Sequence, residues 1–370
     1  MLENVFEQQV DHIASSTRRC GLTHDSTCSP YVVAAEGYCV AVRALDHKEV
    51  YNQIECVDGN FETIHKGDVL IGVLGERQAL KGYSGRLPYR IRVGDSLHVL
   101  NMGGIIGECT SDHPDLGPAL RVEILGAVLV EQDGKNHHAR IQDYALPPIY
   151  SLDTSAPIVL VSGTSMNTGK TLAACEIVSG LTERGFRVAA GKATGAALRR
   201  DVRNMSERGA IGVASFSDLG VVASTNKQMA PFAKGLINHL NAEYSPDVIV
   251  LELGDGFIGY YGVDELLLDK ELQKHVAVNV VAATDLAGVW SADQQFRLRY
   301  DAKLHIVTGP VTDNAVGKQY IEQVLGITAI NAMQNARALN DKLAELFGGL
   351  PRGNVATNSE RAEPTKQSGA

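Results

Sequence analysis

The segment from residue 158 to residue 171 constrains the fold of this chain more than any other. An apolar, largely β-branched run at 158–162 predicts a buried strand. Gly163 and Gly169 permit close and unusual backbone turns, and a helix starting at Lys170 would direct its first amides and its positive dipole end at an anion. A strand, a glycine loop, a Lys-Thr pair and a helix in this order predict a phosphate-binding loop.

This loop fits a nucleoside triphosphate and its metal ion. Lys170 would reach the outer phosphates, and the Thr171 hydroxyl would take one position on Mg²⁺, which prefers oxygen ligands. Five residues, rather than the usual four, separate the two glycines. The expected nucleotide contacts in the loop are Gly163, Thr164, Ser165, Met166, Asn167, Thr168, Gly169, Lys170 and Thr171.

Length and charge limit the classes of protein that this chain fits. With 370 residues it exceeds the size that one core usually serves, so two domains are expected. A net charge of -9 argues against a nucleic-acid partner, because such binding depends on clustered positive charge. No apolar run approaches the ~20 residues that cross a bilayer, and the first residues do not resemble a secretory signal. We therefore expect a cytoplasmic protein with neither a nucleic-acid nor a membrane partner.

The pattern of short strands and turns changes near residue 157. Upstream, turn pairs such as Asp58-Gly59 and Gly94-Asp95 separate short apolar runs, which is typical of an all-β barrel or sandwich. The glycine-containing stretches 72–83 and 101–107 are either barrel turns or substrate-facing loops, and turns are favoured. We expect an N-terminal extension over 1–30, a β-barrel-like domain over 31–130, a linker over 131–156, a nucleotide-binding domain over 157–348 and a disordered tail over 349–370.

Downstream of residue 157, strands alternate with amphipathic helical stretches. This alternation predicts an α/β fold with a doubly wound, mostly parallel sheet of P-loop NTPase type, covered by helices on both faces. Ligands of such sheets bind at the carboxyl ends of the strands. Strands are expected near 158–162, 187–191, 247–252, 276–283, 303–308 and 327–331, and helices near 170–184, 228–243, 263–274, 313–324 and 333–347.

Charged residues follow the second strand and the next apolar segment. Lys192 at the end of the second strand could offset charge on a transferred phosphoryl group. Asp218 lies in an otherwise small and apolar context and could ligate Mg²⁺. Asp201 competes with Asp218 for that role, and the sequence alone does not separate the two.

Two later strand ends also carry candidate residues. The apolar strand 248–251 ends in Glu252, where a P-loop enzyme carries its second acidic group for magnesium or water. Asp313 follows the fifth strand, at the position where many nucleotide-binding proteins of this class contact the base. The Asn-Lys-x-Asp signature of guanine-specific proteins is absent, which favours ATP over GTP.

These motifs resemble the dethiobiotin synthetase and cobyrinic acid diamide synthetase branch of P-loop proteins. The G-T-x-x-x-x-G-K-T loop of that branch is similar to Gly163–Thr171, its strand-two lysine is similar to Lys192, and its Glu-Gly-x-Gly strand end is similar to Glu252–Gly256. The resemblance covers about residues 157–347 and implies Mg²⁺-ATP, with a substrate carboxylate or carbamate activated as a mixed phosphate anhydride. An N-terminal β domain is not part of those enzymes, so the resemblance does not extend to the substrate.

The leading hypothesis is therefore a Mg²⁺-ATP-dependent enzyme that activates a small acidic substrate by phosphoryl transfer, as a kinase or as an amide- or carbamate-forming ligase. Lys170 and Lys192 would offset phosphate charge, while Glu252 with Thr171 and Asp218 would organise Mg²⁺. The alternatives are a nucleotide-dependent switch and a P-loop acyltransferase-type protein, in which the β domain binds the partner or the substrate. A homodimer is left open.

Overall fold

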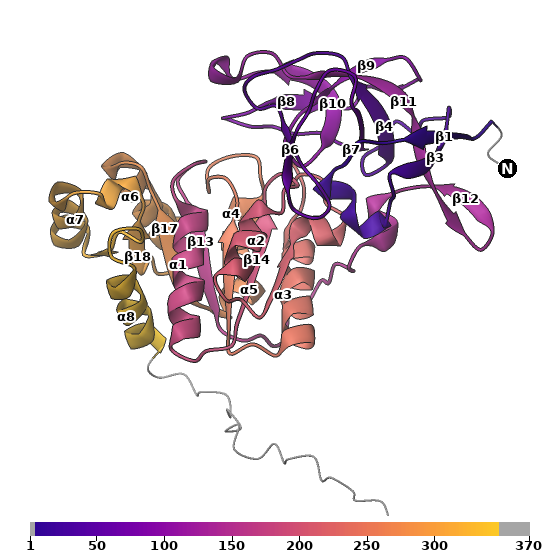
Figure 1. The fold of residues 1–370 in the computed structure, drawn as a ribbon. Helices are drawn as coiled ribbons and strands as arrows, with labels where there is room; N and C mark the ends of the chain where they lie inside the picture. The colour runs from indigo at the N-terminus through magenta and orange to yellow at the C-terminus, as the bar shows by residue number, and fades with distance from the viewer. Residues whose placement is uncertain (1–3, 348–370) are drawn as a thin grey trace, which may run out of the picture.

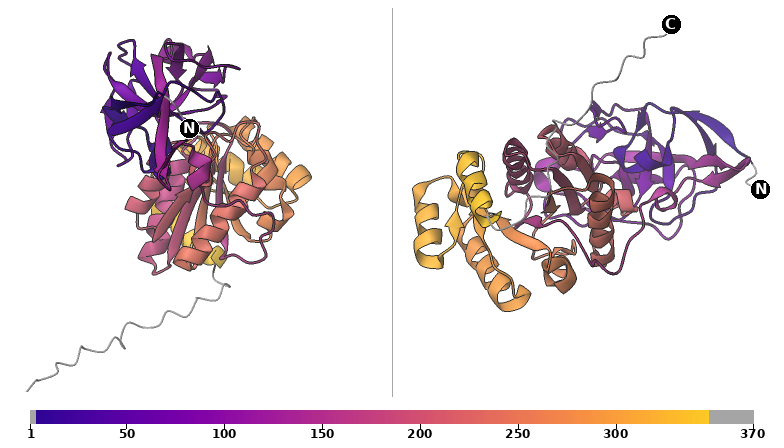
Figure 2. Two further views of the ribbon diagram at one scale, coloured as in Figure 1. Left: turned by 90° about the vertical axis from the view of Figure 1, so that its right-hand side faces the viewer. Right: turned by 90° about the horizontal axis from the view of Figure 1, so that it is seen from below.

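A computed structural model describes residues 4–347 of the chain. Figure 1 shows an N-terminal region of strands resting against a C-terminal region in which helices surround a sheet, and the two views of Figure 2 show the same arrangement. The tail expected over 349–370 lies outside the described residues. Within residues 4–347, no helix combines the length and the apolar character needed to cross a bilayer.

The C-terminal region is built on a seven-stranded parallel sheet with the order β15-β14-β16-β13-β17-β18-β19. The strand that feeds the phosphate loop, β13, lies at the centre of this order and pairs with β16 and β17. The strands are β13 (Ile158–Gly163), β14 (Val188–Thr194), β15 (Gly212–Ser215), β16 (Val248–Leu253), β17 (Val276–Ala282), β18 (Ile306–Thr308) and β19 (Thr328–Ala329).

Helices cover both faces of this sheet, so the predicted doubly wound α/β fold is confirmed. Successive residues of β13 point to opposite faces: Val159 and Val161 pack with α1 and α8, while Ile158 and Leu160 pack with α3, α4 and α6. The helices are α1 (Lys170–Glu183), α2 (Arg200–Glu207), α3 (Ala230–Tyr244), α4 (Val263–Leu268), α5 (Lys270–Gln273), α6 (Leu286–Gln295), α7 (Ala315–Tyr320) and α8 (Ala336–Phe347).

Three elements of the sheet region were not predicted. Strand β15 is only four residues long and contains Gly212, Ala214 and Ser215, so it lacks the apolar run on which a strand prediction rests. Helix α2 is strongly polar, and α6 contains Gly288 and Ser291, which weaken a helical pattern. The single helix expected over 263–274 is divided by Asp269, which caps the start of α5 by accepting the Leu272 amide at 2.9 Å.

The N-terminal region forms a barrel-like sheet, as the sequence predicts. Strand β11 pairs with β4, β4 with β7, β7 with β10, β10 with β9, and β9 again with β11, which closes the ring. Only the β7–β10 pair of this ring is parallel. The strands of the region are β1 (Phe6–Gln9), β2 (His12–Ile13), β3 (Asp25–Ser29), β4 (Cys39–Ala44), β5 (Gln53–Glu55), β6 (Phe61–Thr63), β7 (Val69–Leu74), β8 (Ser84–Arg86), β9 (Ser96–Val99), β10 (Ile105–Ser111), β11 (Arg121–Gln132) and β12 (Lys135–His138).

The edges of this β domain differ from the predicted boundaries. Strands β1, β2 and β3 lie within the expected extension, yet β3 pairs with β11 and β2 with β7. At the other end, β11 continues into a hairpin with β12 through Asp133 and Gly134, which both have positive φ. Both boundaries of the β domain depend on which strands pair, and a local sequence pattern does not predict pairing between distant segments.

The β domain is fixed to the sheet domain through the segment that follows β14. The Asn101 side chain donates to the Ala197 carbonyl at 2.7 Å, and the Arg199 amide donates to buried Glu55 at 2.7 Å. Ala197, together with Val222 and Ala223, packs into a hydrophobic cluster of the β domain. The β domain therefore holds the chain that leaves β14 at the carboxyl edge of the parallel sheet.

Replacing Gly103 with alanine should weaken this interface. The added Cβ would collide with the Ala197 carbonyl oxygen, and a backbone atom cannot turn aside as a flexible side chain can. We expect the free energy of unfolding to fall by about 2–3 kcal/mol, as in other overpacked sites, measured by urea denaturation. Gly94→Ala is the matched control: a Cβ there meets nothing within 4 Å, and its φ of +87° adds only a backbone cost of about 1 kcal/mol. An equal loss in the two variants would contradict the close contact.

Candidate functional site

The loop between β13 and α1 has the conformation that a phosphate-binding loop requires. Asn167 and Gly169 have φ of 59° and 92°, a region that glycine and asparagine tolerate best. A Cβ at Gly163 would lie 2.6 Å from the Thr168 hydroxyl, so the loop folds back tightly on the strand. The Lys170 amine crosses the loop and donates to the Ser165 carbonyl at 2.7 Å. The amides that begin α1 and the amine of Lys170 therefore gather at one place.

Glu252 lies beside the start of α1 because β16 pairs with β13 in a register that sets Val161 opposite Glu252. The Thr171 hydroxyl donates to Glu252 Oε1 at 3.0 Å. The other carboxylate oxygen, Oε2, is buried and has no hydrogen-bond partner within residues 4–347. Burial, reinforced by the charge of Asp201, raises the pKa of Glu252. A hydroxyl next to a carboxylate with an unused oxygen fits Mg²⁺, which takes oxygen ligands.

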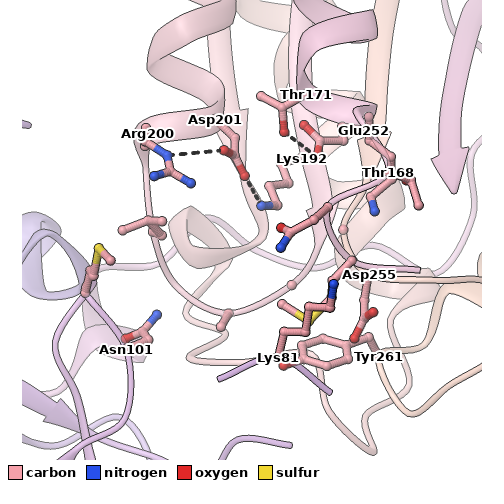
Figure 3. Close-up of a pocket in the computed structure, with 18 of the residues that line it drawn as sticks. Lys81, Asn101, Thr168, Thr171, Lys192, Arg200, Asp201, Glu252, Asp255 and Tyr261 are labelled. Atoms are coloured by element: carbon pink, nitrogen blue, oxygen red, sulfur yellow. Dashed lines mark hydrogen bonds and ion pairs between the residues drawn. The ribbon is translucent and has the colours of Figure 1, made fainter. Parts of the chain in front are cut away.

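Lys192 completes the same row, since β14 pairs with β16 in a register that sets Lys192 opposite Glu252. The lysine is 8% exposed and forms an ion pair with Asp201 of α2, drawn in Figure 3. Burial alone would lower the pKa of Lys192, but the adjacent Asp201 charge outweighs it and raises that pKa. Lys170 forms no ion pair with residues 4–347, and burial lowers the pKa of its amine. The site thus holds two buried lysines, of which Lys192 has a raised pKa and Lys170 a lowered pKa.

Asp218, predicted from the sequence to help hold Mg²⁺, lies apart from this group and does not line the cavity beside it. It lies in a short 3-10 helix, Phe216–Leu219, and accepts the Ser215 amide at 2.9 Å in a capping box. Its other oxygen accepts from Arg18 of the β domain at 2.6 Å. Capping and an interdomain ion pair therefore occupy this carboxylate, and Asp201 is the aspartate near Glu252.

Asp313 does not line the cavity beside the phosphate loop. It is exposed, follows β18, and accepts the side-chain amide of Asn331 at 2.8 Å. The preceding Gly309 does lie close to the loop, since a Cβ there would be 2.5 Å from the Thr168 carbonyl oxygen. Asn331 was not singled out from the sequence, although its place just after β19 is the kind of position where ligand contacts occur.

A cavity of about 720 Å³ opens beside these residues and is shared by the two domains. Barrel turns were the favoured interpretation of 72–83 and 101–107, with substrate-facing loops as the alternative. In the structure Arg77 lines the cavity, as do Lys81 and Asn101, which Figure 3 labels. Its lining comprises Tyr51, Arg77, Lys81, Asn101, Met102, His113, Asp115 and Leu116 from the β domain, and Met166 to Leu172, Lys192, Gly195, Ala196, Leu198, Arg200, Asp201, Glu252, Gly254, Asp255 and Tyr261 from the sheet domain.

Asp255 is a further acidic residue of this wall that sequence reasoning did not assign. It follows β16 with a φ of 71° and accepts the Gly256 amide at 2.8 Å. Burial raises the pKa of its carboxyl group. The available sequence signal was its position three residues after Glu252, in the glycine-rich segment that follows β16. Ligands of parallel sheets bind just after the ends of the strands.

A central parallel strand, a tight glycine loop, a Lys-Thr helix start and an acidic neighbouring strand define the class: the C-terminal domain has the fold of a P-loop NTPase. The chain matches no family model. No curated protein matches its sequence.

Several solved structures share part of this fold. A DUF1611 family protein from Anabaena variabilis is 15% identical, with 54% of this chain and 61% of that one covered and a TM-score of 0.37. The 54 kDa signal recognition particle protein from Aeropyrum pernix K1, in complex with GDP, is 15% identical, with 53% and 47% covered and a TM-score of 0.35. Hydrogenase maturation factor HypB from Archaeoglobus fulgidus is 13% identical, with 51% and 90% covered and a TM-score of 0.33.

The match spans less than half of the signal recognition particle protein. At these identities and scores, the similarity transfers neither a substrate nor a nucleotide to this chain. None of the three is a dethiobiotin or cobyrinic acid diamide synthetase, so that resemblance stays a prediction.

Glu252→Gln should stabilise the nucleotide-free protein at neutral pH. The pKa of Glu252 is raised in the folded state, so the folded protein holds this proton at a higher pH than the unfolded chain does. Its contribution to the free energy of unfolding therefore falls as the pH rises above the ordinary value of 4.5. Glutamine removes this dependence, and the advantage of the variant should grow from pH 5 to pH 8 in urea denaturation.

The matched control is Glu183→Gln, at an exposed position near the end of α1. It should leave the pH dependence of unfolding as in the unaltered protein. A Glu252→Gln variant that is less stable than the unaltered protein across this pH range would show that the carboxylate is well solvated or fully paired.

Proposed function

We propose that this protein binds a Mg²⁺-nucleoside triphosphate at residues 163–171 and transfers its terminal phosphoryl group to a small acidic molecule held in the adjoining cavity. The observation that carries the proposal is the junction of the loop with that cavity: Lys170, Thr171 and Glu252 line the same space as side chains of the β domain. A volume of about 720 Å³ is of the size that small-molecule sites have.

The residues of the chain supply positioning and charge for this reaction. The loop amides and the α1 dipole favour the phosphates, and Lys170 is free to leave the Ser165 carbonyl for a phosphate oxygen. Thr171 and Glu252 would hold the metal ion, which when bound neutralises phosphate charge. Lys192 is kept charged and in place by Asp201, so it would meet a developing negative charge without reorganisation.

Lys170→Ala tests the nucleotide site. We expect nucleotide affinity or turnover to fall by about 100-fold or more, the range seen when one buried charge-stabilising donor is removed. Binding and product release are measured with ATP and with GTP, each with and without Mg²⁺; GTP is included because the signal recognition particle protein above was solved with GDP. Lys66→Ala, an exposed turn lysine of the β domain, is the control. Unchanged binding and turnover in Lys170→Ala would refute the proposal.

A second candidate is a nucleotide-dependent switch, and one specific contact supports it. The start of α2 links the two domains, because Asp201 pairs with Lys192 while the Arg199 amide donates to Glu55 of the β domain. A phosphate that drew Lys192 away from Asp201 would alter the restraint on α2, and through Glu55 the change would reach the β domain.

One experiment separates the two candidates. The enzyme should release nucleoside diphosphate slowly alone and faster when a panel of small organic acids is added. The switch should ignore that panel, and hydrogen exchange of residues 52–59 should differ between the diphosphate-bound and the triphosphate-bound protein. Acceleration by an acid without any change in exchange would exclude the switch.

A further inference from the structure

Arg77, the buried arginine of the cavity wall, forms no ion pair with any carboxylate of residues 4–347. It is 5% exposed and lines the cavity, yet no carboxylate within the described residues lies within ion-pair distance of it. One terminal nitrogen donates to the Leu100 carbonyl, and Nε has no hydrogen-bond partner in the described part of the chain. Because a buried charge without a partner is costly, this guanidinium is in a position that an anion would satisfy.

The surroundings hold Arg77 in place without neutralising it. Its amide and carbonyl pair with those of Gly85 at 2.9 and 2.7 Å, which fixes the backbone. Tyr51 and Tyr261 lie beside the guanidinium as hydrogen-bonding neighbours, and Asp255 acts on it electrostatically without forming an ion pair. Gly82 leaves room for it, since a Cβ there would lie 2.8 Å from its Nη2. The arginine is therefore preorganised, and its Nε keeps a donor that no group within residues 4–347 uses.

A second cation reinforces this part of the wall. Lys81, on the same loop, is exposed and lines the same cavity as Tyr261 and Asp255 (Figure 3). Both cations come from the β domain, whereas Lys170, Lys192 and Arg200 line the cavity from the sheet domain. The cavity thus contains two separate groups of cations on opposite domains.

We propose that Arg77, assisted by Lys81, binds a carboxylate of a small organic acid on the β-domain wall of the cavity. A guanidinium matches a carboxylate with two parallel hydrogen bonds, and it does so more selectively than a lysine amine. The role of this acid as phosphoryl acceptor rests on the proposed function, but its binding to Arg77 requires no nucleotide. The β domain then serves as the carboxylate-recognising half of the site.

The test measures ligand-induced stabilisation of the full-length protein. Succinate, glutarate and citrate are titrated at constant ionic strength, with inorganic phosphate as a parallel arm, and the melting temperature is followed. All titrations are done in Lys170→Ala, so that the phosphate loop does not contribute, and repeated in the unaltered protein saturated with Mg²⁺-nucleotide. We expect a saturable rise with at least one acid.

Arg77→Met should lower the affinity for that acid by roughly 10- to 100-fold, as expected for the loss of charge-assisted hydrogen bonds. Lys81→Ala, at an exposed position, should weaken it several-fold. Arg86→Met is the matched control, because Arg86 is exposed and pairs with Glu108 outside the cavity lining, and it should bind normally. If Arg77→Met does not fold, Arg77→Lys replaces it, because lysine keeps the positive charge and removes the planar guanidinium. A loss of acid affinity in Arg77→Lys and in Lys81→Ala then supports the proposal, and an unchanged affinity in both contradicts it.

The proposal is overturned if no acid gives a saturable rise, if the rise survives the Arg77 substitution, or if only phosphate produces it. It is also overturned if Arg77→Met lowers nucleotide affinity while acid binding persists, since Arg77 would then serve the phosphates. Acid binding that depends on Arg77, in a protein that binds no nucleotide, would support this inference and refute only the proposed function.

Discussion

The parallel pairing of β13, β16 and β14 is the constraint on which the site depends. The registers set Glu252 opposite both Val161 and Lys192, so two charged residues far apart in sequence lie beside each other and next to the strand that leads into the phosphate loop. The strands bury apolar side chains on both faces, and a one-residue slip would exchange those faces. The hydrophobic core therefore fixes the position of the polar row to within one strand residue.

The buried charged residues of the site differ in how completely they are paired. Lys192 and Asp201 neutralise each other, whereas Glu252 keeps one oxygen without a hydrogen-bond partner and Lys170 donates only to a carbonyl among the described contacts. Such incomplete satisfaction lowers stability and is typical of residues selected to meet a ligand. The paired Lys192 is held in place by Asp201, whereas Glu252 and Lys170 have unused capacity for a metal ion and a phosphate.

The β domain changes what the phosphate loop faces. Its contacts through Asn101, Glu55 and Arg18 hold it over the carboxyl edge of the sheet, where ligands of parallel sheets bind. A P-loop domain alone would leave that edge to solvent. Here the β domain covers that edge and contributes Arg77 and Lys81 to the cavity wall, so the cavity has positively charged residues that do not belong to the phosphate loop.

The sequence by itself determined the local elements: the strand, loop and helix around Gly163–Thr171, the alternation behind the parallel sheet, and Glu252 at a strand end. These rest on periodicity and turn chemistry, which act between near neighbours. Only the tertiary structure decided that Asp201 rather than Asp218 joins Glu252, that residues 6–29 belong to the barrel-like sheet, and that Arg77 reaches the cavity. Each of those outcomes depends on contacts between distant segments, where burial and pairing outweigh any local preference.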